Sequence, residues 1–194
     1  MIRQIQGGHT NIGWLDSYHS FSFGEYHNPE RMGFGALRVI NDDTIKPGTG
    51  FGKHSHKNME IITIMLEGEL LHEDDFNSKA LLKKGDVQAI SAGKGIVHST
   101  TNPDDNLNSE LLQIWITPNE LNVTPLYRSS SIDSKECQNK FQQIISLFKT
   151  GAGLWIYQNV WFSIATLDIN TIASYSVNDN KNGFTFSLCK EVQC

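Results

Sequence analysis

Short apolar or alternating segments recur along the chain, with turn residues between them. The segments lie at residues 35–40, 60–66, 87–90, 111–116, 154–157 and 160–167. They are rich in Ile, Val, Phe, Tyr and Trp and are short for helices, so the pattern predicts strands. Turn signals such as Pro47-Gly48 and Lys84-Gly85-Asp86 separate them. Regularly spaced strands with Gly-rich turns predict an all-β sandwich or barrel rather than an α/β sheet.

One stretch in the last third of the chain departs from this pattern. Residues 136–149 place apolar side chains at helix-like spacing, although a strand flanked by loops explains the same residues equally well. A candidate domain boundary precedes this stretch at residues 117–119, and the serine run at 129–131 resembles a linker. We therefore expect two regions, an N-terminal domain at 1–122 and a shorter C-terminal region at 123–194.

Charge and composition narrow the classes of partner. The chain has 16 Lys and Arg against 21 Asp and Glu, a net charge of −5, and no basic cluster, so direct nucleic-acid binding is not expected. The N-terminus lacks the apolar core of a signal peptide, and no apolar run approaches the roughly 20 residues that span a bilayer. Three cysteines, Cys137, Cys189 and Cys194, make no disulfide framework. We expect a cytoplasmic protein that binds no membrane, and a protein partner stays open.

Two histidines near residue 55 are the strongest chemical signal. Side chains alternate along a strand, so His54 and His56 point to the same face and can coordinate one ion. Glu60 has the same parity and reaches that face if the intervening turn does not change register. A second segment, residues 85–102, supplies His98 from another strand. Imidazoles presented by two strands suit a first-row metal such as Fe, Ni, Cu or Zn.

The two segments together are stronger evidence for a metal site than the His-x-His pair. Alone, such a pair is usually a feature of the surface or core that binds no metal. Their order matches the paired motifs of the cupin superfamily, with Ser91 standing where the second motif usually has Pro. The matching residues are His54, His56, Glu60, Gly68, Gly85, Gly93, His98 and Asn102.

Longer strings resemble one family of cupins, the pirins. They read FSFGEYHNPERMGFGALRVINDD, GKHSHKNMEIITIMLEGELLHEDD, KKGDVQAISAGKGIVHS and LLQIWITP, within residues 12–118. The resemblance implies a cupin double-stranded β-helix, arranged as a bicupin whose N-terminal barrel alone holds metal. It also implies a mononuclear iron-type site with His54, His56 and His98 as ligands. Some pirins are quercetin 2,3-dioxygenases, and others act as transcriptional cofactors through protein contacts.

Two departures from the pirin pattern matter. Pirins usually have a ligand Glu two residues after the second-motif His, and here that position is Thr100, a poor ligand beside a carboxylate. Either Glu60 takes the fourth position or water completes a three-histidine site. The region after residue 122 is also short for a second barrel, so that barrel is abbreviated or the chain is truncated. An incomplete barrel exposes strand edges that invite pairing.

Other candidate residues carry weaker expectations. His72 and Asp74 resemble a family His-x-Asp segment, and we expect a turn role without metal. Arg38 is expected to pair with Asp42 or Asp43, because a buried Arg is rare unless paired. Aromatic residues could line a pocket for a planar substrate, although each is more often core. These residues are Phe21, Phe23, Tyr26, Phe34 and Phe51.

The leading functional hypothesis is a metal-dependent dioxygenase that acts with O2 on a flavonol such as quercetin. The expected cofactor is one divalent transition metal, Fe(II) first, with Zn, Ni, Cu or Mn as alternatives. Within the matched motifs, Glu60 is the carboxylate that remains to act as the catalytic base. It cannot easily serve as both the base and the fourth metal ligand. A rival hypothesis is a non-catalytic cupin that binds a protein partner or senses redox state through its metal. A third is a metal-free barrel.

Overall fold

The protein is described here by a computed structural model, which covers residues 7–177 and residue 183. Its regular structure is almost entirely β, as the sequence predicts. The elements are β1 (Gly8–Asn11), β2 (Leu15–His19), β3 (Leu37–Ile45), β4 (Gly50–His56), β5 (Glu60–Glu67), β6 (Glu69–Asp74), β7 (Lys79–Lys83), β8 (Asp86–Ser91), β9 (Ile96–Thr101), β10 (Ser109–Ile116), β11 (Leu126–Ser131), α1 (Ser134–Cys137), β12 (Gln142–Ser146), β13 (Leu154–Trp155) and β14 (Phe162–Ile164).

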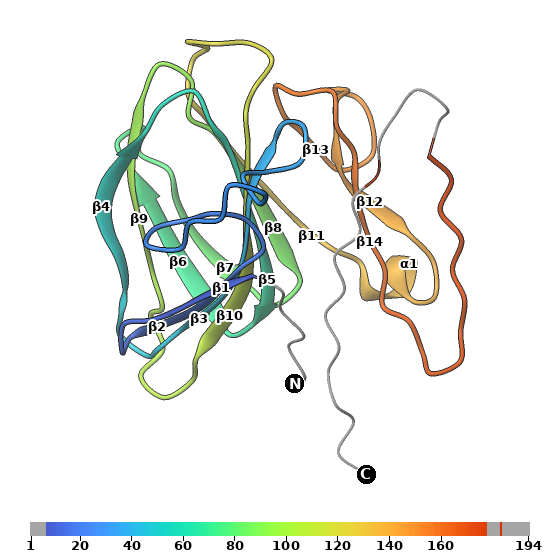
Figure 1. Cartoon of the computed structure of the whole chain (residues 1–194), viewed down its shortest axis with the longest axis horizontal. Helices are drawn as coiled ribbons and strands as arrows, with labels where there is room; N and C mark the ends of the chain where they lie inside the picture. The colour runs from blue at the N-terminus through green and yellow to red at the C-terminus, as the bar shows by residue number, and fades with distance from the viewer. Residues whose placement is uncertain (1–6, 178–182, 184–194) are drawn as a thin grey trace.

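Two sheets face each other and form the barrel, and a small third sheet covers one side (Figure 1). The larger sheet has seven strands in the order β1-β2-β3-β10-β5-β8-β11. The sheet opposite has four strands in the order β4-β9-β6-β7. The third sheet, β13-β12-β14, packs against the outer face of the seven-stranded sheet. The seven-stranded sheet is therefore the middle layer of three.

Burial along β5 reflects this position in the middle. Its first six residues are all buried, because both faces of the strand are covered. Ile62 and Ile64 belong to the core shared with Ile144 and Ile145 of β12. Ile61 belongs to a separate apolar cluster with residues of β8 and β9. Residues 142–146 are thus a strand, which decides between the two interpretations of that stretch.

The expected boundary near residue 122 lies between β10 and β11. β11 nevertheless pairs with β8, with Leu126 opposite Ser91 and Ser131 opposite Asp86. Tyr127 of β11 stacks on His72 of β6, with ring centroids 4.6 Å apart. Residues after the boundary thus complete the N-terminal barrel, and the division at 122 stays a prediction.

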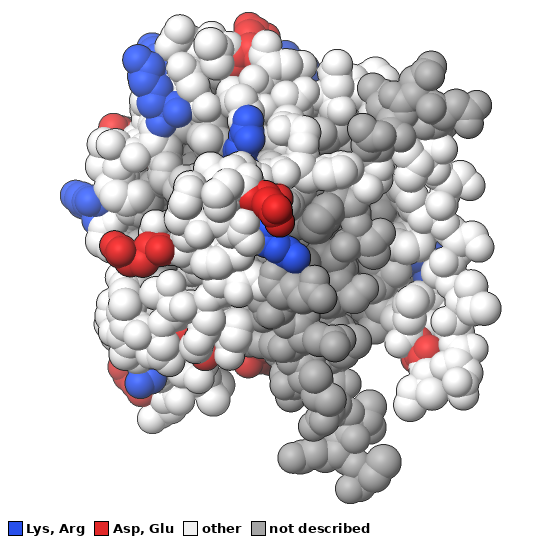
Figure 2. Space-filling model, viewed as in Figure 1, with Lys and Arg blue, Asp and Glu red and all other residues white. Residues whose placement is uncertain are grey.

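Positive and negative side chains are mixed on the surface of the protein. Lys and Arg side chains are scattered among Asp and Glu on the face shown in Figure 2, with no broad basic patch there. Among the described residues, no helix is long and apolar enough to cross a membrane. Cys137 is buried with a free thiol, while Cys189 and Cys194 lie outside the described residues.

Candidate metal centre

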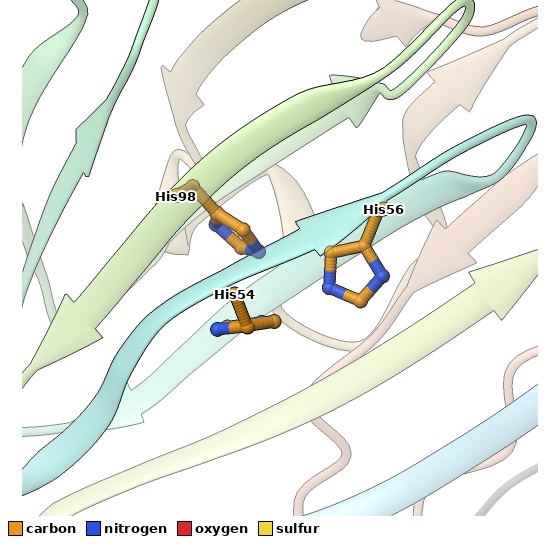
Figure 3. Close-up of side chains that lie close together, drawn as sticks. All are labelled: His54, His56 and His98. Carbon is orange, nitrogen blue, oxygen red and sulfur yellow. The ribbon is translucent and has the colours of Figure 1, made fainter.

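Three histidines from two neighbouring strands converge inside the barrel. β4 supplies His54 and His56, and the antiparallel register places His98 of β9 directly opposite His54. One ligand nitrogen of each ring lies within 4.8 Å of those of the other two. Figure 3 shows the three rings close together, with His54 and His56 projecting from β4 and His98 from β9. The structure therefore brings together all three histidines that the sequence singles out.

The protonation state of these rings favours a cation. Burial and then the charge of His54 lower the pKa of His56 to about 4. Burial and the neighbouring imidazoles lower the pKa of His98 to about 3. Both rings are therefore neutral near pH 7, and neutral imidazole is the form that binds metal. The Nδ1 of His54 donates a hydrogen bond to the Gly52 carbonyl at 2.7 Å, which leaves its Nε2 with a lone pair for a metal.

Unsatisfied polar atoms at the site support the same conclusion. Nε2 of His56 and both ring nitrogens of His98 are buried without a hydrogen-bond partner among the described residues. A buried polar group without a partner costs roughly 1–3 kcal/mol. A first-row cation bound by the three rings would satisfy one nitrogen of each, so this donor set fits such an ion.

Glu60 does not join this cluster. Its side chain accepts a hydrogen bond from Ser91 Oγ at 2.8 Å, and it lies near Arg128 and the backbone of Tyr157. Glu60 shares the strand face of Ile62 and Ile64, which look toward the third sheet rather than into the barrel. The structure thus does not bring Glu60 to the position of a fourth ligand or of a base beside the histidines.

Thr100 occupies the position at which the resemblance to pirins implies a ligand Glu. It is buried on β9, opposite His72 of β6, and lines the cavity beside His54 and His98. His72 is itself fully buried, and its Nε2 bonds to Asp74 at 3.1 Å. Its ring centroid lies 5.4 Å from that of His98. His72 is therefore part of the barrel interior beside the centre, whereas Asp74 both bonds to His72 and accepts hydrogen bonds from the backbone N–H groups of the turn after β6.

A cavity of about 200 Å³ opens beside the histidines. Two of the five aromatic residues proposed for a pocket line it, Phe23 and Phe51. Phe21 instead belongs to the core on the outer face of the seven-stranded sheet. Trp115 also lines the cavity, and its ring meets those of Phe23 and His56 edge to face.

The other residues that were proposed for the pocket or for an ion pair, Tyr26, Phe34 and Arg38, do not line this cavity. The side chain of Phe34 is 38% exposed, and the ring of Tyr26 packs over Gly8. Arg38 is exposed, and its Nε donates a hydrogen bond to the hydroxyl of Thr117 at 3.4 Å rather than to either aspartate. The expected buried ion pair of Arg38 is therefore not the arrangement that the structure has.

A row of polar side chains, four of them buried and Gln113 half-buried, crosses the inner face of the seven-stranded sheet, and sequence reasoning missed it. His19 bonds to Asn41 at 2.9 Å, and Thr63 links Gln113 and Gln88 at 2.8 and 2.9 Å. The strand registers align these five residues across β2, β3, β10, β5 and β8. We call these residues the polar row. A signal for it exists in the polar residues that interrupt each apolar strand.

Comparison with known proteins agrees with this architecture. The pirin family model matches residues 2–116. The quercetin 2,3-dioxygenase of Escherichia coli K12 is 51% identical over 127 residues, which are 66% of this chain and 55% of that protein. The chain thus spans about half the length of the first curated relatives it matches.

Two of the solved structures that are similar to this chain come from Escherichia coli. The crystal structure of YhhW from Escherichia coli has a TM-score of 0.77 and 44% identity, covering 81% of this chain and 66% of that one. The bacterial pirin YhhW in complex with nickel(II) has a TM-score of 0.74 and 45% identity, covering 79% and 65%. With the family model matched over more than half of its length, this chain belongs to the pirin family of cupins.

Proposed function

We propose that this protein is a metal-dependent dioxygenase that acts on flavonols such as quercetin, with His54, His56 and His98 holding the ion. The observation that carries the proposal is the convergence of three imidazoles, two of them with pKa values lowered to about 4 and 3, beside a cavity. The similar Escherichia coli protein named quercetin 2,3-dioxygenase supports the activity.

The identity of the ion is part of the proposal. We propose Fe(II), and the nickel(II) bound by the similar pirin makes Ni the first alternative, ahead of Zn, Cu and Mn. When bound, any of these cations would act as a Lewis acid that lowers the pKa of a coordinated hydroxyl, and a redox-active ion such as Fe(II) would also supply redox chemistry with O2. Elemental analysis of the purified protein distinguishes these ions.

The chain's own residues bind and orient the substrate in this proposal. A cavity of about 200 Å³ is smaller than the roughly 300–1,000 Å³ of pockets that enclose drug-sized ligands, so one oxygen-bearing ring enters it and the rest of the flavonol stays at the mouth. Phe23, Phe51 and Trp115 give that ring apolar walls. Three members of the polar row, His19, Asn41 and Gln113, face its oxygen atoms.

Oxygen consumption tests the activity. Protein loaded with Fe(II) under anaerobic conditions is mixed with quercetin and O2, and the loss of both is followed. We expect turnover above that of free Fe(II), and we expect His98→Ala to abolish it. Turnover at the level of free metal would refute the enzymatic proposal.

A second candidate function is a non-catalytic cupin whose metal stabilises a surface for a protein partner. The neutral Thr100 favours it, because a site without the family's carboxylate has lost one anionic ligand. Its test is a pull-down that depends on metal occupancy while turnover stays at background. In either case we propose the cytoplasm as the compartment, on the basis of the few cysteines and the free thiol of Cys137.

A further inference from the structure

A buried carboxylate lies in the wall of the cavity that holds the histidines. Asp43 of β3 is 2% exposed and lines the same cavity as His54, His98 and Thr100. The register of β2 and β3 sets Ser17 directly opposite, and its hydroxyl donates a hydrogen bond to Oδ1 of Asp43. Asp43 is thus held in place by a neighbouring strand.

The other carboxylates near the site lie outside the cavity wall or at its edge. Glu60 faces the third sheet and accepts a hydrogen bond from Ser91. Asp74 bonds to His72 and to the backbone of its own turn. Glu25 also lines the cavity but is exposed at its edge. Among the described residues that line the cavity, Asp43 is the buried carboxylate.

Burial of Asp43 needs an explanation beyond packing. A carboxylate inside a barrel costs free energy unless it is hydrogen-bonded, and an apolar residue would fill the same space without that cost. The next inward-facing residues along β3 differ sharply, because Asn41 belongs to the polar row whereas Ile45 joins an apolar cluster. Asp43 therefore lies at the border between the apolar end of the barrel and the polar cavity.

We propose that Asp43 is the general base of this site and that Ser17 is its positioning residue, an inference that rests on the proposed function. The O–H bond of a substrate hydroxyl breaks, its proton goes to a carboxylate oxygen of Asp43, and the electron pair stays on the substrate oxygen. Asp43 becomes a neutral carboxyl group, and the substrate becomes an anionic oxygen donor. No oxidant takes part in this proton transfer.

Several titratable groups share the environment of Asp43. His19 of β2, His54 of β4, His98 of β9 and Glu25 line the same cavity, while β10 presents only the neutral Gln113 and Trp115 there. The test therefore compares variants at one position rather than assigning a pH midpoint to one group.

The test is anaerobic, so proton transfer is read without turnover. A flavonol absorbs at longer wavelength once its hydroxyl is deprotonated, and quercetin is titrated with metal-loaded protein across pH. We expect the native protein to produce the shifted band at lower pH than Asp43→Asn. Ser17→Ala is expected to shift the pH midpoint in the same direction by a smaller amount. Asp105→Asn, an exposed aspartate in the loop before β10, is the matched control and should behave as the native protein.

Turnover and metal content complete the design. We expect Asp43→Asn to lower kcat by about 100-fold or more, the range for loss of a general base, with metal content unchanged. A native pH profile retained in both Asp43→Asn and Ser17→Ala would overturn the inference, as would the absence of a deprotonated band in the native protein. A native band that moves in Asp43→Asn, without turnover in either protein, would refute the dioxygenase proposal and support the role of Asp43.

Discussion

Replacement of Glu60 by Gln should change how stability depends on pH. Burial raises the pKa of Glu60 to about 7 from its ordinary value of 4.5, against the lowering effects of the Ser91 hydroxyl, the Tyr157 backbone and Arg128. Arg128 in turn donates to Ser91 Oγ at 2.7 Å, and its guanidinium lies 4.1 Å from the ring centroid of Trp155. These contacts join the barrel to the third sheet.

The shift in the pKa of Glu60 sets the size of the effect. Because its folded-state pKa lies above the unfolded value of 4.5, the folded chain keeps a proton that the unfolded chain releases. This contribution to stability is complete below about pH 4.5 and is lost as the pH rises through about 7. One pKa unit corresponds to about 1.4 kcal/mol, so the shift corresponds to about 3 kcal/mol, of which about 2.5 kcal/mol falls between pH 5 and pH 8.

Urea unfolding of the metal-free protein measures this contribution. His56 and His98 have lowered pKa values, so their contribution to stability is lost as the pH falls below 6.5 and opposes that of Glu60. The histidine contribution is the same in the native protein and in Glu60→Gln. It therefore cancels when the unfolding free energy of one is subtracted from that of the other. We expect that difference in unfolding free energy to change by about 2.5 kcal/mol between pH 5 and pH 8.

A matched control lies at the other end of the same strand. Glu67 pairs with Lys84 at 2.7 Å, with its side chain 49% exposed, and Glu67→Gln should change little at either pH. A difference for Glu60→Gln that is equal at pH 5 and pH 8 would refute the reasoning, because it would mean that Glu60 has a similar pKa in the folded and unfolded chains.

Four further predictions follow from the site and its surroundings. His98→Ala should weaken metal binding at least about tenfold by chelator competition, whereas exposed His9→Ala should not. Arg128→Ala should destabilise the fold by about 2 kcal/mol in urea, and more at pH 8 than at pH 5, because the ionised Glu60 then lacks its cation. Thr63→Val should cost about 1–3 kcal/mol in the same assay, because it leaves the buried amide of Gln88 and the half-buried amide of Gln113 without their shared partner. Thr100→Glu should tighten metal binding in the chelator assay, because it places a carboxylate beside the three rings; unchanged affinity would contradict this.

The histidines of the site are predictable because their placement depends on local rules. Two residues on one strand with a single residue between them always share a face, so His54 and His56 need no knowledge of the fold. His98 needs more, because its strand must lie beside theirs. That pairing comes from the resemblance of the second segment to a cupin motif, and the register of β4 and β9 agrees with it.

Parity does not extend to Glu60 because the chain changes sheets between residues 56 and 60. β4 belongs to the four-stranded sheet and β5 to the seven-stranded sheet, and Asn58 in the turn between them has a φ of +51°. The alternation of side chains along β4 therefore does not continue into β5. Glu60 therefore faces outward, on the side of Ile62, although it is an even number of residues from His56.

The polar residues that interrupt the apolar strands are a signal of the polar row, but the sequence alone does not tell which face of the sheet they occupy. A polar residue within an apolar strand normally indicates the solvent side, but the third sheet covers the outer face of β5, so Thr63 is polar on the inside while Ile62 and Ile64 are apolar on the outside. Only the registers of several strands reveal that these polar residues align. An apolar row would satisfy the packing of this layer without buried amides. The row lies opposite the strands that carry the histidines, and three of its members, His19, Asn41 and Gln113, give the cavity a polar wall.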